Sequence, residues 1–326
     1  MNSADVFRIE QFEETRARLR EKLRLTPLLY SDSLSAVSGG QVYLKAESLQ
    51  LTHSFKLRAA YGGLLPRLEE ARRRGAVTGS SGNFAQGLAY AGRELGVQVT
   101  VVMLERSARY KVEATRRLGA EVVFCANEFS ERTARVERIH REQGKVLVHS
   151  FDDEGAIRGN GTLGLELVEQ LPELDAVLVP ASGGGLLSGV AAVVKQLRPQ
   201  AKVYGVQPEH VPSMRVSREK GEPTYVETRP SVADGIVAAC PGRLTFALVE
   251  RYVEDILLVS ESEIVQAVVH LLDREKLVVE PSGALGVAAL RRHLSGQIAG
   301  REVAVVLTGG NVEPSRLAEM VKSASG

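Results

Sequence analysis

The sequence predicts an α/β fold with mostly parallel sheets, on the strength of three observations. Short runs rich in β-branched residues alternate with longer helical patterns along the 326 residues. Parallel strands need crossover connections, and helices of this length supply them. Glycine-rich loops follow several of the expected strands, and in open α/β sheets ligands bind at the carboxyl ends of the strands.

The expected strands are seven short segments. They cover 41–47, 97–104, 120–125, 145–150, 175–180, 202–207 and 302–308. The expected helices cover 54–74, 84–95, 109–118, 129–143, 156–170 and 184–197. Seven strands can form one sheet or two, and the pattern alone does not place a boundary. The polar, glycine-rich passage around residue 150 is a candidate crossing between two units.

The composition is that of a globular protein, with 44% hydrophobic and 25% charged residues. The formal net charge of +1 gives no reason to expect nucleic acid or a membrane surface as a partner. No apolar run approaches the roughly 20 residues that cross a bilayer, and the charged start of the chain has no signal-peptide core. Cys125 and Cys240 have no paired spacing, so neither a disulfide nor a zinc site is expected and a cytoplasmic location fits best.

Four loops combine glycine with Ser, Thr or Asn after an apolar strand. They lie at 78–89, 179–189, 279–286 and 306–314. Small residues let the backbone approach a ligand closely, and helix N-termini offer free N–H groups to an anion. One such loop is usually a plain tight turn, but four in one chain predict a binding site.

The loop with sequence SGGGLLSG is not a dinucleotide fingerprint. Ser188 stands where the third glycine belongs, and the next strand closes on Gln207 in place of an acidic residue. The chain also lacks a G-x-x-x-x-G-K-[ST] motif. What remains is a phosphate held by the backbone N–H groups of residues 182–185 at a helix N-terminus.

Lys56 lies between a phenylalanine and a mostly apolar helical run, in LTHSFKLRAA. On a helix over 54–65 it shares a face with Ala59, Ala60 and Gly63, whose small size leaves room for another body. The ordinary alternative is a lysine whose stem covers a packed helix. The positive end of the helix dipole lowers the pKa of such a lysine, and amines of this kind form Schiff bases with carbonyl compounds such as pyridoxal phosphate. A carbonyl cofactor that carries a phosphate would join Lys56 to the glycine loop.

Five segments together resemble the fold type II pyridoxal-phosphate enzymes: HSFKLRAA, SSGNFAQGLA, SGGGLLSG, EPSGALG and TGGN. Within this group the chain is most similar to the threonine/serine dehydratase and serine racemase family, from about Thr26 to Asn311. The resemblance implies a tryptophan synthase β-like fold of two open, mostly parallel α/β domains with the cofactor in the cleft between them. We expect a large domain from 1–67 and 151–326, a small inserted domain from 68–150, and a homodimer or homotetramer.

The resemblance also implies roles for individual residues in binding pyridoxal 5′-phosphate. Lys56 would form the Schiff base and act as base at the substrate α-carbon, and Phe55 would flank the ring. Asn83 would hydrogen-bond the 3′ oxygen, and Thr308 would face the pyridine nitrogen. The remaining cofactor residues implied are Ser182, Gly183, Gly184, Gly185 and Leu186 around the phosphate, together with Glu280.

The substrate carboxylate is expected at the first of the four loops. The residues implied are Ser80, Ser81, Asn83 and, beside them, Phe84. A helix N-terminus in this loop would suit the negative charge of an amino-acid substrate. In racemases of this family, the residue matching Ser81 delivers a proton from the face opposite the lysine.

Three departures from the family pattern bear on function. Phe84 stands where the family often has histidine, which can reshape the substrate side or be neutral. Ser182 replaces a usual glycine and can add a hydroxyl donor. Racemase-like members bind a cation through a glutamate, a backbone carbonyl and an aspartate, whereas the matching positions here are Gln207, Val211 and Ser213. Two anionic ligands are therefore missing, and we expect no metal there.

We expect a pyridoxal-phosphate dependent β-elimination that converts L-threonine, L-serine or another β-hydroxy amino acid into a 2-oxo acid and ammonia. The alternative is a serine-type racemase that uses Lys56 and Ser81 on opposite faces. A third reading, a cofactor-holding protein without turnover, is disfavoured because Lys56, Ser81, Asn83 and Thr308 occur together. Biosynthetic members of the family carry a regulatory domain after the TGGN motif, so the short stretch that follows it here leads us to expect a short, catabolic-type enzyme.

Overall fold

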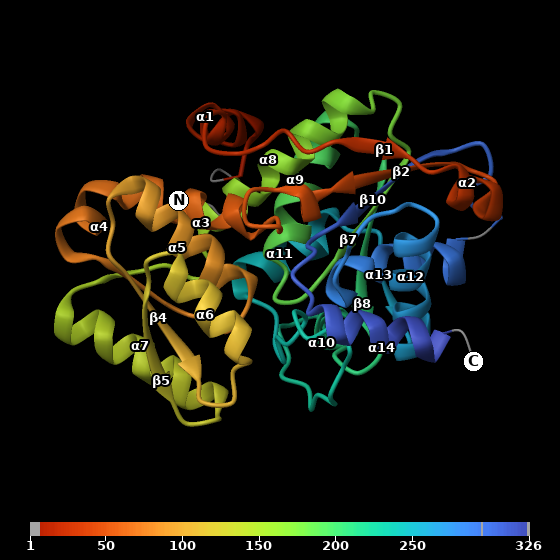
Figure 1. Cartoon of the computed structure of the whole chain (residues 1–326). Coiled ribbons are helices and arrows are strands. Elements are labelled where there is room, and N and C mark those ends of the chain that lie inside the picture. The colour runs from red at the N-terminus through yellow and green to blue at the C-terminus, as the bar shows by residue number, and fades with distance from the viewer. Residues whose placement is uncertain (1–6, 295, 325–326) are drawn as a thin grey trace.

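The computed structural model describes residues 7–294 and 296–324 and confirms an α/β fold, with two separate sheets (Figure 1). The larger sheet has the strand order β1-β2-β10-β7-β8-β9. Its strands are β1 (Leu28–Tyr30), β2 (Gln41–Ala46), β7 (Ala176–Pro180), β8 (Lys202–Pro208), β9 (Asp255–Val259) and β10 (Glu302–Leu307). β1 runs antiparallel to β2, and the other paired strands of this sheet are parallel.

The smaller sheet is parallel and has the order β5-β4-β3-β6. Its strands are β3 (Ala76–Gly79), β4 (Val99–Leu104), β5 (Glu121–Cys125) and β6 (Val146–Leu147). The helices of this region are α4 (Leu68–Arg74), α5 (Asn83–Leu95), α6 (Arg109–Arg117) and α7 (Phe129–Gln143). All of these strands and helices fall inside the predicted small domain at 68–150.

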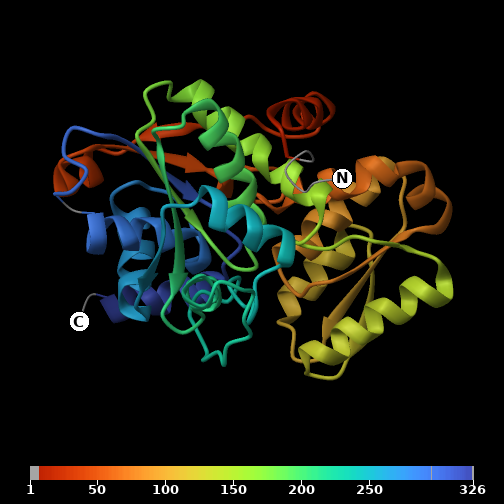
Figure 2. The same cartoon turned by 180° about the vertical axis from the view of Figure 1, so that it is seen from behind.

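The larger sheet is flanked by helices from both ends of the chain, and Figure 2 shows the two sheet-containing units from behind. These helices are α1 (Ile9–Leu19), α2 (Asp32–Ser38), α8 (Glu154–Gln170), α9 (Gly185–Leu197), α10 (Ser213–Lys220), α11 (Arg243–Tyr252), α12 (Glu261–Asp273), α13 (Pro281–Ala289) and α14 (Pro314–Ala324). A π-helical turn covers Leu290–Leu294. None of the helices in the described residues is both long enough and apolar enough to span a bilayer.

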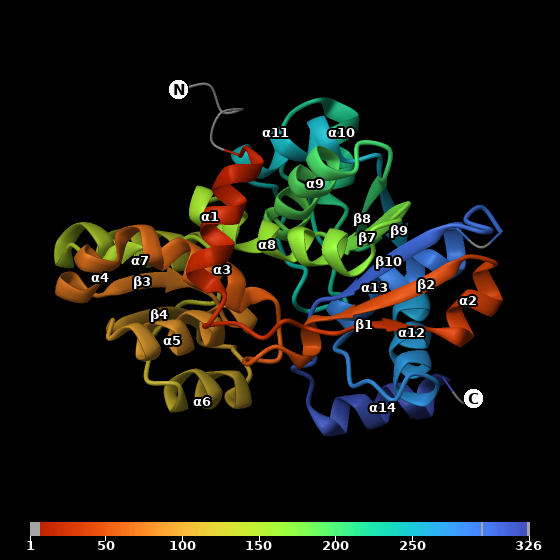
Figure 3. The same ribbon diagram turned by 90° about the horizontal axis from the view of Figure 1, so that it is seen from above.

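Two neighbouring strands of the larger sheet come from opposite ends of the chain. β2 pairs in parallel with β10, from Gln41 beside Glu302 to Ala46 beside Leu307. Figure 3 shows these two strands side by side. Both strands are largely buried, and β10 is rich in Val, as expected of central strands of a sheet covered on both faces.

Each of the seven expected strands is present, although the one at 145–150 shrinks to Val146–Leu147. The strands β1, β3 and β9 were not among those expected from the sequence, and each is only three to five residues long. The single helix expected at 54–74 is three pieces: α3 (Lys56–Leu64), a 3₁₀ turn (Leu65–Arg67) and α4. Pro66 lies in that turn and has no N–H to continue an α-helix, which explains the break.

The helices α3 and α8 cross closely enough that only glycine fits at the crossing. A Cβ on Gly62 would lie 2.2 Å from the Gly155 carbonyl oxygen, and one on Gly159 would lie 2.2 Å from the Arg58 carbonyl oxygen. On its other side, α3 shares a hydrophobic cluster with residues of the smaller sheet and of α5. Because α3 packs with both units, the domain boundary at residue 67 stays a prediction.

Candidate active site

Lys56 is the first residue of α3, and its side chain is half-buried. Its Nζ lies 4.7 Å from the centroid of the Phe55 ring and makes no hydrogen bond to another described residue. Burial lowers the pKa of Lys56 from 10.5 to about 8, and the Glu280 carboxylate limits this drop. An unpaired amine with a lowered pKa is what a nucleophilic lysine needs.

The small residues that share the helical face of Lys56 do not leave space for a ligand, so this expectation is wrong. Ala59 and Ala60 are fully buried in a hydrophobic cluster. A Cβ on Gly63 would lie 2.7 Å from Cγ1 of Val148. Neighbouring protein fills this face, because small side chains here serve close helix packing.

The glycine loop between β7 and α9 presents a row of free donors. Within the described chain, none of the backbone N–H groups of residues 182–187 donates a hydrogen bond. Gly184 has φ +97°, a left-handed conformation that suits glycine. A Cβ on Gly183 would lie 2.4 Å from the Phe151 ring, so the loop is also tightly packed. Free N–H groups at the start of a helix form an anion site.

The Ser182 hydroxyl has a contact that the sequence did not reveal. Its Oγ accepts hydrogen bonds from the backbone N–H groups of Val237 and Ala238, each at 3.3 Å. It therefore fastens the irregular segment before α11 to the glycine loop. The hydroxyl proton is not used in these two bonds, so the expected extra donor toward a ligand stays a prediction.

The N-terminus of α5 forms a second set of polar groups. Asn83 begins this helix, and its Nδ2 donates to Oε1 of Glu280 at 2.6 Å. Ser81 Oγ accepts a hydrogen bond from the Ser107 hydroxyl at 2.7 Å. Ser80 Oγ accepts from the Gly82 N–H at 3.3 Å. The backbone N–H groups of residues 83 and 84 donate no hydrogen bond within the described chain, so they too can hold an anion.

Phe84 lies apart from these polar groups. Its side chain is only 2% exposed and belongs to the hydrophobic cluster that includes Leu88 and Met103. This placement favours a packing role and differs from the expected contact with substrate.

Glu280 and Thr308 approach the site from the larger sheet. Burial, assisted by the nearby Asp234 carboxylate, raises the pKa of Glu280 from 4.5 to about 7. Thr308 follows β10, and its hydroxyl is buried and donates weakly to the Ser282 carbonyl oxygen at 3.4 Å. Lys56, Asn83 and Glu280, which are far apart in the sequence, therefore meet between the two sheets.

A family model described as pyridoxal-phosphate dependent enzyme matches residues 19–309. The chain belongs to the family of pyridoxal-phosphate dependent enzymes. The cofactor of this enzyme is therefore pyridoxal 5′-phosphate.

Individual relatives of this pyridoxal-phosphate dependent enzyme are similar over most of their length. The chain is 43% identical to an L-threonine ammonia-lyase of Thermotoga maritima, over 96% of this chain and 78% of the relative. The solved, processed form of threonine deaminase isoform 2 from Solanum lycopersicum superimposes with TM-score 0.92 at 31% identity, over 100% of this chain and 95% of that one. The serine racemase of Dictyostelium discoideum gives TM-score 0.87 at 33% identity, over 93% and 98%.

The donor set of this pyridoxal-phosphate dependent enzyme fits the cofactor. An aldehyde needs a neutral primary amine, and the unpaired, partly desolvated Lys56 supplies it. A phosphate needs several convergent donors, and the free N–H groups of residues 182–187 supply them. The two features lie at the starts of α3 and α9, and both belong to the region where the sheets meet.

His149 belongs to the surroundings of Lys56, although sequence analysis gave it no role. Its Nδ1 accepts from the backbone N–H groups of Asp152 at 2.8 Å and Phe151 at 3.3 Å. Burial and the nearby Lys56 lower the pKa of His149 despite opposing effects of Asp152 and Asp153, so a neutral ring with its proton on Nε2 is favoured. The signal for it was its position near the end of the strand expected at 145–150, two residues beyond the observed β6.

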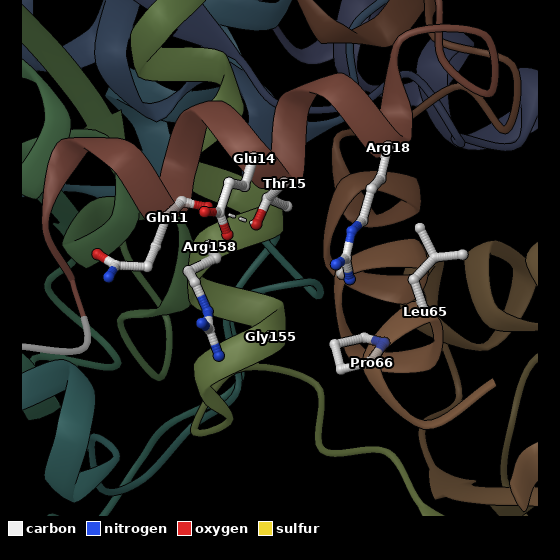
Figure 4. A pocket seen from close by; sticks show the side chains of 9 residues that line it. Gln11, Glu14, Thr15, Arg18, Leu65, Pro66, Gly155 and Arg158 are labelled. Carbon is white, nitrogen blue, oxygen red and sulfur yellow. Dashed lines mark hydrogen bonds between the residues drawn. The ribbon is translucent and has the colours of Figure 1, made fainter. Parts of the chain in front are cut away.

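Two cavities lie away from Lys56 in this pyridoxal-phosphate dependent enzyme. One of about 160 Å³ separates α1 from α8 and the turn at Leu65–Arg67; Figure 4 shows Arg18 and Arg158 on its walls. The other, of about 450 Å³, reaches inward to Arg58, Thr162 and Glu166. Neither is lined by Lys56 or the glycine loop, so we do not assign the cofactor to them.

The inner end of the larger cavity meets a buried ion network beneath α3. The Arg58 guanidinium donates to Glu47 at 2.8 and 2.9 Å and to Glu166 at 2.7 and 2.9 Å. It also donates to the Thr162 hydroxyl at 3.0 Å. Lys45 adds a bond of 2.6 Å to Glu166. The network ties α3 to β2 and α8, and therefore fixes the helix on which Lys56 lies.

Proposed function

We propose that this enzyme is an ammonia-lyase of the threonine/serine type, which converts a β-hydroxy amino acid into a 2-oxo acid and ammonia. The observation that carries the proposal is the 43% identity to an L-threonine ammonia-lyase over 96% of this chain. Lys56, Ser81, Asn83 and Thr308 occur at the positions that the family resemblance requires. The substrate is a small amino acid, with L-threonine and L-serine as the first candidates.

Lys56 is the base in this proposal. Because its pKa is lowered from 10.5 to about 8, far more of its amine is neutral near neutral pH than in an ordinary lysine, and a neutral amine can accept the proton of the substrate α-carbon. When bound, pyridoxal phosphate supplies a sink for the electron pair that this proton leaves behind. Phe55 precedes Lys56, and its ring centroid lies 4.7 Å from the amine, so the ring is assigned to flank the cofactor.

Two sets of free N–H groups suit the two anions of such a reaction. The longer set, residues 182–187, is assigned to the cofactor phosphate because it offers the larger number of donors. The set at residues 83 and 84 is assigned to the substrate carboxylate, assisted by Ser80 and Ser81. Because the sets begin different helices, the substrate is held across the gap between the two sheets.

The neutral hydroxyl of Thr308 is assigned to the pyridine nitrogen. A hydroxyl does not enforce protonation of that nitrogen as a carboxylate would, so the electron sink is weaker. With Thr308 beside it, the bound cofactor would be a weaker electron sink, a property that would favour loss of the β-hydroxyl. This property supports elimination as the main reaction.

An incubation with separate L-threonine, L-serine, D-serine and L-phenylserine tests the proposal, with 2-oxo acid and enantiomer measured together. We expect 2-oxo acid and ammonia from L-threonine or L-serine. A mirror-image amino acid formed without 2-oxo acid would contradict it.

Racemisation is the second candidate, favoured by the similarity to the Dictyostelium discoideum serine racemase. Ser81 would act as acid and base on the face opposite Lys56. The Ser107 hydroxyl donates to Ser81 Oγ, which leaves the Ser81 proton directed elsewhere and available for transfer. A Ser81→Ala variant that keeps the lyase activity and loses enantiomer formation would identify this side reaction.

We also propose a homodimer or homotetramer in the cytoplasm. The oligomer is supported by the family resemblance alone, and light scattering of the purified enzyme measures it. The cytoplasmic location is supported by two half-buried cysteines, Cys125 and Cys240, that are free.

A further inference from the structure

Gln207, the residue where a dinucleotide-binding chain would carry an acid, caps a helix that follows it. It lies near the end of β8 with no exposed surface. Its Oε1 accepts from the backbone N–H groups of Met214 at 3.0 Å and Arg215 at 3.2 Å. Its Nε2 donates to the Ser213 hydroxyl at 3.3 Å. The N-cap residue of α10, Pro212, offers no capping side chain, so the neighbouring strand supplies the cap instead.

The capped end of α10 packs directly against the glycine loop. Met214 is fully buried, and its Cε lies 2.7 Å from the position that a Cβ on Gly184 would occupy. Gly184 in turn precedes the first residue of α9, whose free N–H groups are assigned to the phosphate. The loop is also joined to β8 itself, because the N–H of Ala181 donates to the carbonyl oxygen of Val206 at 2.8 Å. A shift of α10 is therefore transmitted to the phosphate donors.

The same positions do not fit the cation site that the family resemblance describes. Gln207 and Ser213 replace two carboxylates with neutral groups, and hard cations prefer anionic oxygen ligands. The amide oxygen of Gln207 already accepts two backbone hydrogen bonds. Occupying it with a cation would leave the start of α10 without its acceptor.

We propose that Gln207 is a positioning residue for the phosphate loop, and that its side-chain amide holds α10 in place without a bound cation. The proposal rests on the cofactor-dependent function described above and adds a residue that touches neither substrate nor cofactor.

The test compares binding of pyridoxal 5′-phosphate and of pyridoxal to the full-length enzyme, followed by the visible band of the lysine-linked cofactor. Pyridoxal lacks the phosphate, so the ratio of the two affinities isolates the loop. We expect Gln207→Ala to weaken the binding of pyridoxal 5′-phosphate at least tenfold and the binding of pyridoxal less than twofold. Gln207→Glu keeps the acceptor for both N–H groups and should stay within threefold of the parent. Gln207→Asn, whose amide is too short to reach α10, replaces Gln207→Ala if the alanine variant does not fold.

Gln50→Ala is the matched control. The Gln50 amide is equally buried, donates one hydrogen bond to the Arg24 carbonyl and accepts two from the backbone N–H groups of Arg24 and Leu51. Its loss should leave the affinity ratio unchanged. An unchanged ratio in Gln207→Ala, or an equal change in Gln50→Ala, would overturn the positioning role.

A second measurement tests independence from cations. The parent enzyme is assayed for cofactor affinity and melting temperature with EDTA, Mg²⁺ or Ca²⁺. We expect no change in either quantity, whereas a tenfold gain in affinity with either ion would overturn the proposal. A parent enzyme that forms no lysine-linked band at all would instead contradict the proposed function.

Discussion

Helix α3 carries two charged groups, the half-buried Lys56 and the fully buried Arg58, that are only two residues apart and behave in opposite ways. Arg58 has no exposed surface, and its guanidinium makes five hydrogen bonds to Glu47, Glu166 and Thr162. Lys56 makes none to a described residue, and its pKa falls to about 8. Glu280, which acts on Lys56 through space, has a pKa raised to about 7.

The difference shows how one helix can combine a rigid support with a reactive group. Where opposite charges are paired and their hydrogen bonds are complete, burial leaves the charges in place and fixes the geometry. Where partners are incomplete, burial moves each pKa toward the neutral form, which is the form that reacts. The ion network therefore holds α3 in position, and the unpaired Lys56 at the start of the same helix supplies the reactive amine.

The largest effect is expected at the reactive end. Lys56→Ala should abolish the lysine-linked visible band and lower the rate of 2-oxo acid formation at least ~10³-fold, because it removes both the nucleophile and the base. Absorbance spectra and a coupled assay measure the two quantities. An unchanged spectrum would mean that another lysine binds the cofactor.

The largest effect on stability is expected in the ion network. Arg58→Ala leaves Glu47 and Glu166 buried with reduced pairing, so the free energy of unfolding should fall by about 3–5 kcal/mol. Denaturant titration measures this loss. A loss below about 1 kcal/mol would mean that the network does not support α3.

The third expected effect concerns the pH dependence of stability in the cofactor-free protein. The folded pKa of Glu280 lies above its ordinary value, so its contribution is lost as the pH rises from about 4.5 through about 7. The folded pKa of Lys56 lies below its ordinary value, so stability is regained as the pH rises from about 8 toward 10.5. Each change is at most about 3.5 kcal/mol, and screening by solvent reduces the part from the half-buried Lys56.

Two variants separate these contributions in denaturant titrations across pH. Glu280→Gln should remove the fall near neutral pH and keep the rise at alkaline pH, whereas Lys56→Met should do the opposite. Equal slopes of the free energy of unfolding against pH in the parent and both variants would contradict the distinction between the reactive end of α3 and the ion network.

The smallest effect is expected for a pair of the same chemistry at the surface. Arg16 pairs with Glu169, whose side chain is 61% exposed. Arg16→Ala should therefore change the free energy of unfolding by less than about 1 kcal/mol. A loss as large as that of Arg58→Ala would show that pairing, and not burial, decides how much an ion pair contributes to the stability of this protein.

The fold class and the position of Lys56 could be predicted because both depend on local patterns. Strand and helix periods are visible in short windows, and each glycine loop follows its strand directly. The short strand β9 was not predicted because five partly buried residues show little of the alternation between apolar and polar positions that indicates a strand. The break at Pro66 was readable in the sequence but was given too little weight.

The less predictable parts depend on partners that are distant in the chain. Lys45 and Glu166 resemble ordinary surface residues in the sequence, and only the packing of β2 against α8 buries them together. The small side chains of Ala59 and Ala60 suggested room for a ligand, because nothing in the local sequence shows that other parts of the chain fill that space. The contacts of Ser182 and Gln207 likewise depend on segments whose course only the folded chain reveals.

The pairing of β2 with β10 has a consequence for synthesis on the ribosome. All four strands of the smaller sheet lie within residues 76–147, so they can pair while the remainder of the chain is still being translated. The larger sheet cannot be completed until β10 has emerged from the ribosome, more than 250 residues after β2. During this interval β2 can pair with β1 on one edge, but its other edge still lacks β10. The nascent chain is then open to misassembly and most dependent on chaperones.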